Sequence, residues 1–153
     1  MEKRLVRYMQ ETKGFTLVEV MIVVLIIGII ASLSMPSLSK SKMAAHEASA
    51  ISAIRTLVTA QITYATKGTS AGNFAPDLAA LQAANLIDSV LGSGTAEAYS
   101  FALSGSGVQY TIDARPLVYG TSGVRSFFTD ATGAIRYTTA NAAATVSDPG
   151  LGQ

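Results

Sequence analysis

A run of 21 residues from Phe15 to Met35 contains a single charged side chain, Glu19, and is otherwise almost entirely apolar. A helix of this length rises roughly 30 Å, which matches the hydrocarbon thickness of a bilayer. Because a backbone in lipid must satisfy its own hydrogen bonds, a single spanning segment of this kind forms a helix. The sequence therefore predicts a transmembrane helix over residues 15–38.

The residues before this run carry a net positive charge. Residues 1–14 hold four Lys or Arg side chains against two Glu, and a basic flank marks the cytoplasmic end of a membrane helix. A secretory signal peptide is one alternative, with small residues at 31–35 for cleavage, although its apolar core is normally shorter. Gly14 offers a better small-residue site, on the cytoplasmic side. A plain membrane anchor is a second alternative, but it does not explain Glu19.

A carboxylate at the position of Glu19 is costly near the edge of a bilayer unless a positive charge pairs with it. One interpretation is that Glu19 reaches the headgroups or is protonated. The other is that the chain is cut after Gly14, so that Phe15 acquires an α-amine at the level of the bilayer edge. That amine would be a natural partner for Glu19 of a neighbouring chain.

Composition and motifs exclude several classes of function. The chain has no cysteine and a formal net charge of +1, which rules out disulfides and thiol chemistry and does not suggest a general nucleic-acid binder. No metalloprotease or phosphate-loop motif is present, and Gly105-Ser106-Gly107 lies in a predicted hairpin rather than a strand-to-helix turn. We therefore expect no catalytic residues, no cofactor and no enzymatic activity.

The helix is predicted to continue past the apolar run with one apolar side. Ile51, Ile54, Val58 and Ile62 recur at helical spacing, widened by Leu57 and Tyr64, up to about Lys67. This gives an amphipathic continuation over residues 39–68 and a helix of about 50 residues, near 80 Å long. Pro36 predicts a bend or local unwinding over residues 33–36. His46 is expected to be a solvated helix residue.

The remaining residues predict a small α+β head over residues 69–137. A loop over 68–76 leads into a short helix with Asp77 near its N-cap. Two hairpins follow, with turns at 104–107 and 130–133. The four expected strands cover residues 99–103, 108–114, 125–129 and 134–137. Residues 138–153 are rich in Ala, Thr and Gly without a period and are expected to form a flexible tail.

The heptapeptide Lys13-Gly14-Phe15-Thr16-Leu17-Val18-Glu19, after a basic leader, resembles the processing site of type IV pilins and of the related pseudopilins of type II secretion. The resemblance implies that a prepilin peptidase removes residues 1–14 by cutting after Gly14 and methylates the amine of Phe15. It also implies that Glu19 pairs with that amine during assembly, and that Pro36 is the helix-kinking proline of the family. Gly28 is a further assembly candidate because Gly28 and Ser32 form a small-xxx-small pair suited to close helix packing, although membrane helices also tolerate glycine without such a role.

The same resemblance implies a lollipop-shaped subunit: a long helix whose second half packs on a small antiparallel sheet. The implied partners are other copies of the chain, the peptidase and an inner-membrane assembly platform. The implied location is the inner membrane, with one crossing and a cytoplasmic N-terminus, and then a periplasmic or cell-surface filament. Some major pseudopilins bind calcium through acidic groups near the C-terminus, which makes Asp130 a weak calcium candidate, but a hairpin turn explains Asp130 better. No other metal site is expected.

Three functions remain open at the level of sequence. The first is the structural subunit of a type IV pilus-like filament, and the second is the major pseudopilin of a type II secretion system. The third is a minor pilin that binds DNA or a surface. DNA binding is disfavoured because the candidate cations of the head, Arg115, Arg125 and Arg136, are outnumbered by acidic side chains.

Overall fold

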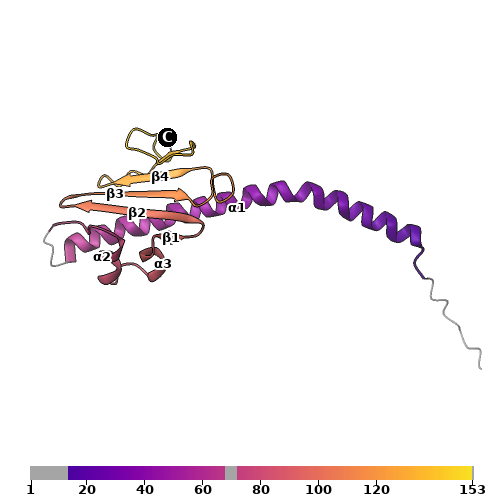
Figure 1. Cartoon of the computed structure of the whole chain (residues 1–153), viewed down its shortest axis with the longest axis horizontal. Coiled ribbons are helices and arrows are strands. Elements are labelled where there is room, and N and C mark those ends of the chain that lie inside the picture. The colour runs from indigo at the N-terminus through magenta and orange to yellow at the C-terminus, as the bar shows by residue number, and fades with distance from the viewer. Residues whose placement is uncertain (1–13, 68–71, 153) are drawn as a thin grey trace, which may run out of the picture. The chain divides into compact units, whose positions relative to one another are not determined.

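The computed structural model describes residues 14–67 and 72–152 (Figure 1). The expected leader, up to residue 13, and residues 68–71 of the expected loop lie outside the described residues. The chain divides into two compact units, Met1–Ser37 and Leu38–Gln153, and each is described by itself below.

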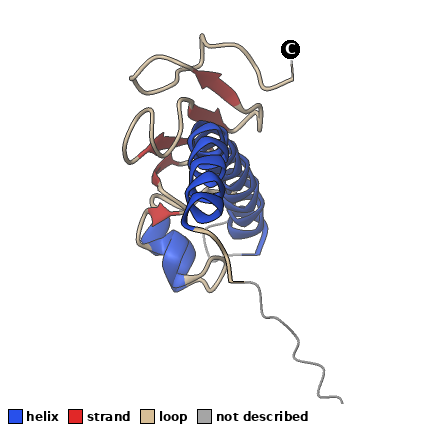
Figure 2. Ribbon diagram, turned by 90° about the vertical axis from the view of Figure 1, so that its right-hand side faces the viewer, coloured by secondary structure: helices blue, strands red, loops and turns tan. Residues whose placement is uncertain are grey.

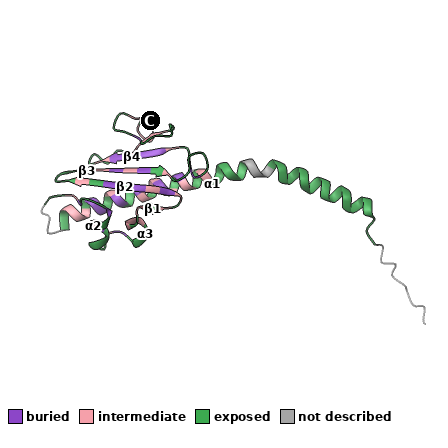
Figure 3. Ribbon diagram, in the orientation of Figure 1, coloured by how far each residue is buried: buried purple, intermediate pink, exposed green. Residues whose placement is uncertain are grey.

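A single helix, α1, runs from Leu17 to Lys67 and confirms the predicted long N-terminal helix. It is helical through residues 33–36, so the local unwinding expected at Pro36 is not observed. In the first unit, residues 14–33 are all exposed (Figure 3). A helix that is apolar on every side has no face to bury within its own chain, and it therefore needs a lipid or protein surround.

In the second unit, α1 buries a narrower face than the sequence predicts. The buried side chains at its centre are Ile54 and Leu57, whereas Val58 is half-buried and Ile62 is 53% exposed. Five residues of this face, Glu47, Ala50, Ile54, Leu57 and Gln61, follow one another in alternating steps of three and four residues, and Ala60 is buried beside them. Ile62 follows Gln61 by one residue, which rotates it by roughly 100° away from that face. The apolar pattern therefore predicts the centre of the buried face, but the buried polar residues Glu47 and Gln61 at its two ends turn the face away from Ile62.

The second unit contains a five-stranded antiparallel sheet in the order β1-β2-β3-β4-β5. The strands are β1 (Thr95–Ala96), β2 (Tyr99–Ser106), β3 (Gln109–Pro116), β4 (Ser126–Asp130) and β5 (Arg136–Thr138). The sheet lies along one side of the second half of α1 (Figure 2). The predicted α+β class is confirmed.

The prediction of four strands is wrong because β1 is an additional one. Residues Glu97 and Ala98 connect β1 to β2 and both have positive φ, 49° and 65°. Two positive φ values characterise the type I′ turn of a tight hairpin, which Asn-Gly or Asp-Gly normally signals. The Glu-Ala pair carries no such signal, and a two-residue strand is too short to show alternation.

The first predicted hairpin is correct but its turn is shorter. β2 and β3 pair as far as Ser106 and Gln109, so that only Gly107 and Val108 form the turn. Gly107 supplies the positive φ of 60° that such a turn requires at its first position. The second hairpin, β4–β5, turns at Asp130–Gly133, as the sequence predicts.

The predicted short helix after Asp77 is in fact two helices. The Asp77 carboxylate accepts a hydrogen bond from Ala80 N at 2.8 Å, which confirms the N-cap of α2 (Leu78–Ala83). The chain then turns at Asn85, whose φ is 53°, and α3 (Ser89–Gly92) begins at a second cap, Asp88. Asn tolerates this left-handed conformation better than most residues, and that allows the break.

The core of the second unit forms where α1 and α2 meet one face of the sheet. Its largest fully buried apolar side chains come from α1, from α2 and from three adjacent strands, and they are Ile54, Leu57, Leu81, Tyr99, Ile112 and Phe127. The alternating burial along β2 and β3 leaves their other face to solvent. Sheet and helix thus share one layer of packed side chains.

Residues 139–152 fold back onto β5 instead of extending away from it. Pro149 O accepts a hydrogen bond from Tyr137 N at 3.1 Å, and Ile135 O accepts one from Leu151 N at 2.8 Å. Ala144 is buried. This course differs from the expected flexible tail, because backbone groups on the open edge of β5 supply partners that composition does not reveal.

Candidate assembly site

The start of α1 fixes the position of Glu19. The Thr16 hydroxyl accepts a hydrogen bond from Glu19 N at 3.2 Å, so Thr16 acts as the N-cap and Glu19 lies in the first helical turn. Thr-Leu-Val-Glu also matches the Ser/Thr-x-x-Glu pattern of a capping box, a signal that the sequence analysis did not use. A carboxylate here interacts favourably with the helix dipole.

Around Glu19, the helix exposes a continuous apolar surface. Phe15 is 81% exposed, and between Leu17 and Leu33 every large apolar side chain is at least about half exposed. An 18-residue window in α1 has a mean hydropathy of 2.7 and none of it is buried, so by length and composition this helix could cross a membrane. Soluble monomers rarely expose apolar surface of this extent. The surface therefore requires a bilayer or other protein chains.

The remaining predicted site residues lie along the same segment. Gly14 is exposed, and a Cβ built at Gly14 or at Gly28 would meet no atom within 4 Å. Pro36 lies within α1. Among the described residues, no ion pair joins the Glu19 carboxylate to a cation. The segment thus presents an acid, two unobstructed glycines and an apolar surface for contacts beyond the single chain.

Comparison with known proteins agrees with this geometry. Residues 9–35 match the family model described as the prokaryotic N-terminal methylation motif. This chain carries a prepilin-type methylation motif. The match ends at Met35 and leaves the second unit to other comparisons.

The chain is also similar to the type IV major pilin protein PilA of Myxococcus xanthus (strain DK1622), with 33% identity over 75 residues. That match covers 49% of this chain and 34% of the relative, so the chain spans about a third of the length of the protein it matches. No solved structure matches the chain. The predicted resemblance to type IV pilins is confirmed.

The pilin-like chain contains a polar contact that sequence reasoning missed. Glu47 is 5% exposed, and its carboxylate accepts hydrogen bonds from Val124 N at 2.9 Å and from Arg125 N at 3.2 Å. Arg125 Nε forms an ion pair with Glu47 Oε2 at 2.7 Å. Three donors for one buried carboxylate compensate its loss of water. We call this contact the Glu47 latch, because it fixes the loop before β4 to α1.

Aromatic rings complete the surroundings of the latch. Tyr99 donates its hydroxyl proton to Arg125 O at 2.8 Å, and a Cβ at Gly123 would lie 2.1 Å from that hydroxyl oxygen. Arg125 also lies 5.6 Å and 5.5 Å from the ring centroids of Phe127 and Tyr137. Burial, and secondarily the Glu47 charge, raise the pKa of the Tyr99 phenol well above its usual value, so Tyr99 stays a neutral donor.

A second buried contact holds the chain after the end of α1. The Gln61 side chain is fully buried; its Nε2 donates to Ala75 O at 3.0 Å and its Oε1 accepts from Ala75 N at 2.7 Å. One amide thus satisfies both backbone groups of Ala75. Like Glu47, Gln61 lies on the buried face of α1. Its spacing from Ile54 and Leu57 places a polar side chain on that apolar face, and this is the sequence signal that could have indicated a buried hydrogen bond.

Asp130 lies in a turn whose hydrogen bonds account for its position. Asp130 Oδ1 accepts hydrogen bonds from Thr132 N at 2.9 Å and from its hydroxyl, and the Thr132 hydroxyl holds the pKa of Asp130 below its usual value. This geometry is that of an Asx turn closed by Gly133, whose φ is 73°. In the described part of the chain, no three His, Cys, Asp or Glu side chains group as metal ligands.

His46 is half-buried and lines a cavity with Gly120 and Ser122, which differs from the solvated position expected.

Proposed function

We propose that this chain is the structural subunit of a type IV pilus-like filament. In this proposal it is held in the inner membrane with a cytoplasmic N-terminus, cut after Gly14, methylated at Phe15 and then assembled with other copies. The observation that carries the proposal is Glu19, which Thr16 fixes in the first turn of α1, where the residues up to Leu33 are exposed and otherwise almost entirely apolar. It is strengthened by the methylation motif over residues 9–35.

Assembly through Glu19 follows from the cost of burying a charge. When apolar helices pack side by side, Glu19 leaves the water and the headgroups, and a buried carboxylate is tolerated only with a partner. The amine of Phe15 on an incoming chain is a cation near the same level, four residues before Glu19. Docking in any other register leaves both charges without partners, so the pair selects one register. Methylation of the amine leaves its positive charge in place.

The processing step is consistent with the surroundings of Gly14. It is exposed and has no neighbouring atom within 4 Å of a built Cβ, so a peptidase could reach the bond that follows it. Replacing Gly14 would change recognition by the peptidase without disturbing the fold.

A pilus is favoured over a secretion pseudopilus because the similar protein from Myxococcus xanthus is a type IV major pilin. The two filaments differ in position and in the effect of deletion. We expect long extracellular filaments. Short periplasmic filaments, combined with loss of exoprotein release on deletion, would support the pseudopilin alternative.

The decisive experiment separates the charge of Glu19 from its role at the helix start. Glu19→Gln keeps the capping pattern, since Gln also serves at this position, but removes the charge. Thr16→Val removes the cap and keeps the charge. We expect Glu19→Gln to lower the yield of sheared filaments at least about tenfold, at unchanged membrane abundance and leader removal. Thr16→Val should have a much smaller effect.

The mass of the mature N-terminus provides a separate test of processing. Intact protein from filaments should begin at methylated Phe15, and Gly14→Ile should retain residues 1–14. Filaments made from chains that still begin at Met1 would overturn the processing step, and normal filament yield from Glu19→Gln would overturn the pairing.

A further inference from the structure

The exposed charges on the second half of α1 and those on residues 77–97 have opposite signs. From Leu38 to its end, α1 carries Lys40, Lys42, Arg55 and Lys67, all exposed, and its single acid is the buried Glu47. Residues 77–97 carry three exposed acids, Asp77, Asp88 and Glu97, and no Lys or Arg. Within the residues that the structure describes, the only ion pair is the Glu47 latch. These exposed charges are therefore not neutralised by an ion pair within the described chain, although Asp77 and Asp88 also cap α2 and α3.

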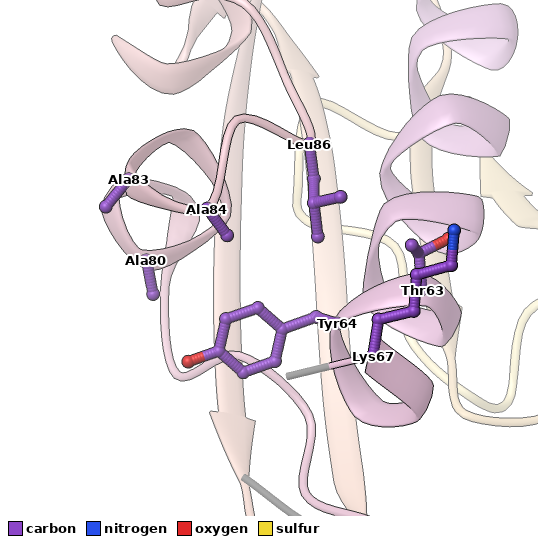
Figure 4. A pocket seen from close by; sticks show the side chains of 7 residues that line it. All are labelled: Thr63, Tyr64, Lys67, Ala80, Ala83, Ala84 and Leu86. Atoms are coloured by element: carbon purple, nitrogen blue, oxygen red, sulfur yellow. The ribbon is translucent and has the colours of Figure 1, made fainter. Parts of the chain in front are cut away.

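The basic side carries a groove along α1. Its deeper part, of about 350 Å³, is lined by Tyr64 and Lys67 of α1, by alanines of α2 and by Leu86. Figure 4 shows the Tyr64 side chain reaching from α1 toward α2. A second hollow continues the groove toward Arg55 and shares Thr63 and Leu86 with the first. The result is a channel with an apolar wall of alanines and Leu86, a wall of Thr side chains on α1, and a cation near each end.

The polar side chains of the α1 wall are already occupied by their own helix. Thr56, Thr59 and Thr63 each donate to the carbonyl four residues before it, at 3.1, 2.9 and 2.8 Å. Their hydroxyl protons are thus used internally. A ligand in this groove would therefore be recognised by apolar contact and by Arg55 and Lys67, rather than by a network of hydrogen bonds.

The acidic side carries a surface of matching character. Val90 on α3 is 54% exposed, and α3 packs against β1, which leads directly to Glu97. Asp88 caps the same helix and is also exposed. Two carboxylates with an apolar side chain between them in the sequence complement, in charge, a groove with two cations near its ends.

We infer that the groove between Arg55 and Lys67 receives the Asp88–Glu97 edge of a second copy of this chain. Because the groove and the edge are different surfaces, the contact is heterologous, and repeated heterologous contacts that do not close form an open helical polymer. The inference rests on the proposed filament function. It adds a lateral contact in the second unit that is separate from the pairing at Glu19.

The test uses charge reversal in the full chain, with filament yield after shearing as the readout. The two single variants are Lys67→Glu and Glu97→Lys. Lys67 and Glu97 are exposed, and changing either one leaves the helix caps intact, whereas Asp88 is avoided because it caps α3. Each single variant should lower filament yield at least about fivefold, and the double variant should restore most of it. Lys42→Glu makes the same change of charge on the same helix, beside Gly120–Ser122 rather than in the groove, and should leave the yield unchanged.

Salt supplies a second measurement that needs no variant. Wild-type filaments should release subunits more readily as ionic strength rises from about 0.05 to 0.5 M, because rim charges are screened. The double variant should keep this dependence and each single variant should lose it. Equal membrane abundance of all variants checks folding; if Lys67→Glu fails this check, Lys67→Gln takes its place and should lower the yield by a smaller factor.

Normal yield from both single variants, or a double variant that is worse than either, would overturn the contact. A loss in Lys67→Glu that Glu97→Lys does not rescue would point to another acidic partner and would also overturn it. These results are distinguishable from a failure of the proposed function. In that case the wild type would form no filaments, or Glu19→Gln would form them at normal yield, whatever the charges of the second unit.

Discussion

Glu47 and Arg125 are separated by 78 residues in the sequence, yet their side chains meet at 2.7 Å. The pair is asymmetric, because the Glu47 side chain is 7% exposed and that of Arg125 is 33% exposed. Glu47 also binds two backbone amides of the same loop. The carboxylate therefore depends on its partners more than the guanidinium does, and it fixes the loop before β4 to α1.

Glu47→Ala should lower the free energy of unfolding by about 3 kcal/mol, because it leaves two part-buried backbone amides and the Arg125 guanidinium without their acceptor. Arg125→Ala should cost a similar amount, and the double variant should cost less than the two single losses together. Urea unfolding of the detergent-solubilised chain, followed by near-UV circular dichroism of tyrosine, measures each value. Lys42→Ala on the exposed side of α1 is the control. Strictly additive losses would show that the two side chains are not coupled.

Gly105→Ala should lower the free energy of unfolding by about 2 kcal/mol or more. The new Cβ would lie 2.1 Å from Ala75 O, a backbone atom that Gln61 holds in place, so relief requires the chain after α1 to move. Ser104→Ala, at the exposed preceding position of β2, should change the stability by less than about 0.5 kcal/mol. An unchanged unfolding midpoint for Gly105→Ala would mean that this close approach does not exist in solution.

Thr129→Val should raise the free energy of unfolding by up to about 1 kcal/mol. The Thr129 hydroxyl is buried in β4, and within the described chain it has no hydrogen-bond partner. Valine has nearly the same shape and removes the cost of burying that group. Thr111→Val on the neighbouring strand is half-exposed and should be close to neutral. A loss of stability in Thr129→Val would indicate a partner such as a bound water.

Asp130 and Asp113 should respond to pH in opposite directions. The hydroxyl of Thr132 lowers the pKa of Asp130, so its stabilising contribution is present above the unfolded value near 3.8 and is lost as pH falls through the lower folded pKa. Desolvation raises the pKa of Asp113. The ionised carboxylate of Asp113 therefore destabilises the fold at neutral pH, and this cost disappears as the group is protonated at lower pH. Asp130→Ala should therefore be destabilising at pH 7 and neutral near about pH 2. Asp113→Asn should be stabilising at pH 7. Thermal unfolding of both variants between about pH 2 and pH 7 measures these effects. Equal pH profiles for the two variants would contradict the opposite pKa shifts of Asp130 and Asp113.

Gly28→Leu should leave membrane insertion unchanged and lower filament yield. A side chain at this position meets nothing within the single chain, so any effect must arise between chains. If helices pack closely at Gly28, a large side chain keeps them apart, while Gly28→Ala should be tolerated better. The amount of sheared filament relative to the protein in the membrane fraction measures this effect. Equal filament yields for the wild type and Gly28→Leu would show that Gly28 has no role in helix packing.

Features that depend on neighbouring residues were accessible from the sequence. The helix from Leu17 to Lys67 follows from apolar periodicity, the Asp77 cap from its position before an apolar run, and the β4–β5 turn from Asp130 and Gly133. The methylation motif is likewise local, because recognition reads adjacent side chains. Each of these signals lies within one or two turns of chain.

Features that depend on distant partners were not accessible. In the sequence, Glu47 and Gln61 look like ordinary polar helix residues. Their role is visible only when Val124 and Arg125 lie beside Glu47 and Ala75 lies beside Gln61. The stripe of α1 is displaced from Ile62 toward Gln61 for the same reason, because buried hydrogen bonds, as well as apolar area, decide which face turns inward. The β1–β2 turn uses left-handed Glu97 and Ala98, which the surrounding packing must stabilise against their own preference.

The amino-acid sequence by itself determined the membrane-compatible helix, its methylation motif and the single acid within it, since these depend on composition and short-range order. The tertiary structure alone decided which polar side chains of α1 are buried and where the charges of the second unit gather. The physical reason is that a buried polar group is stable only where a complementary group meets it, and the chain supplies that group from residues far along the sequence.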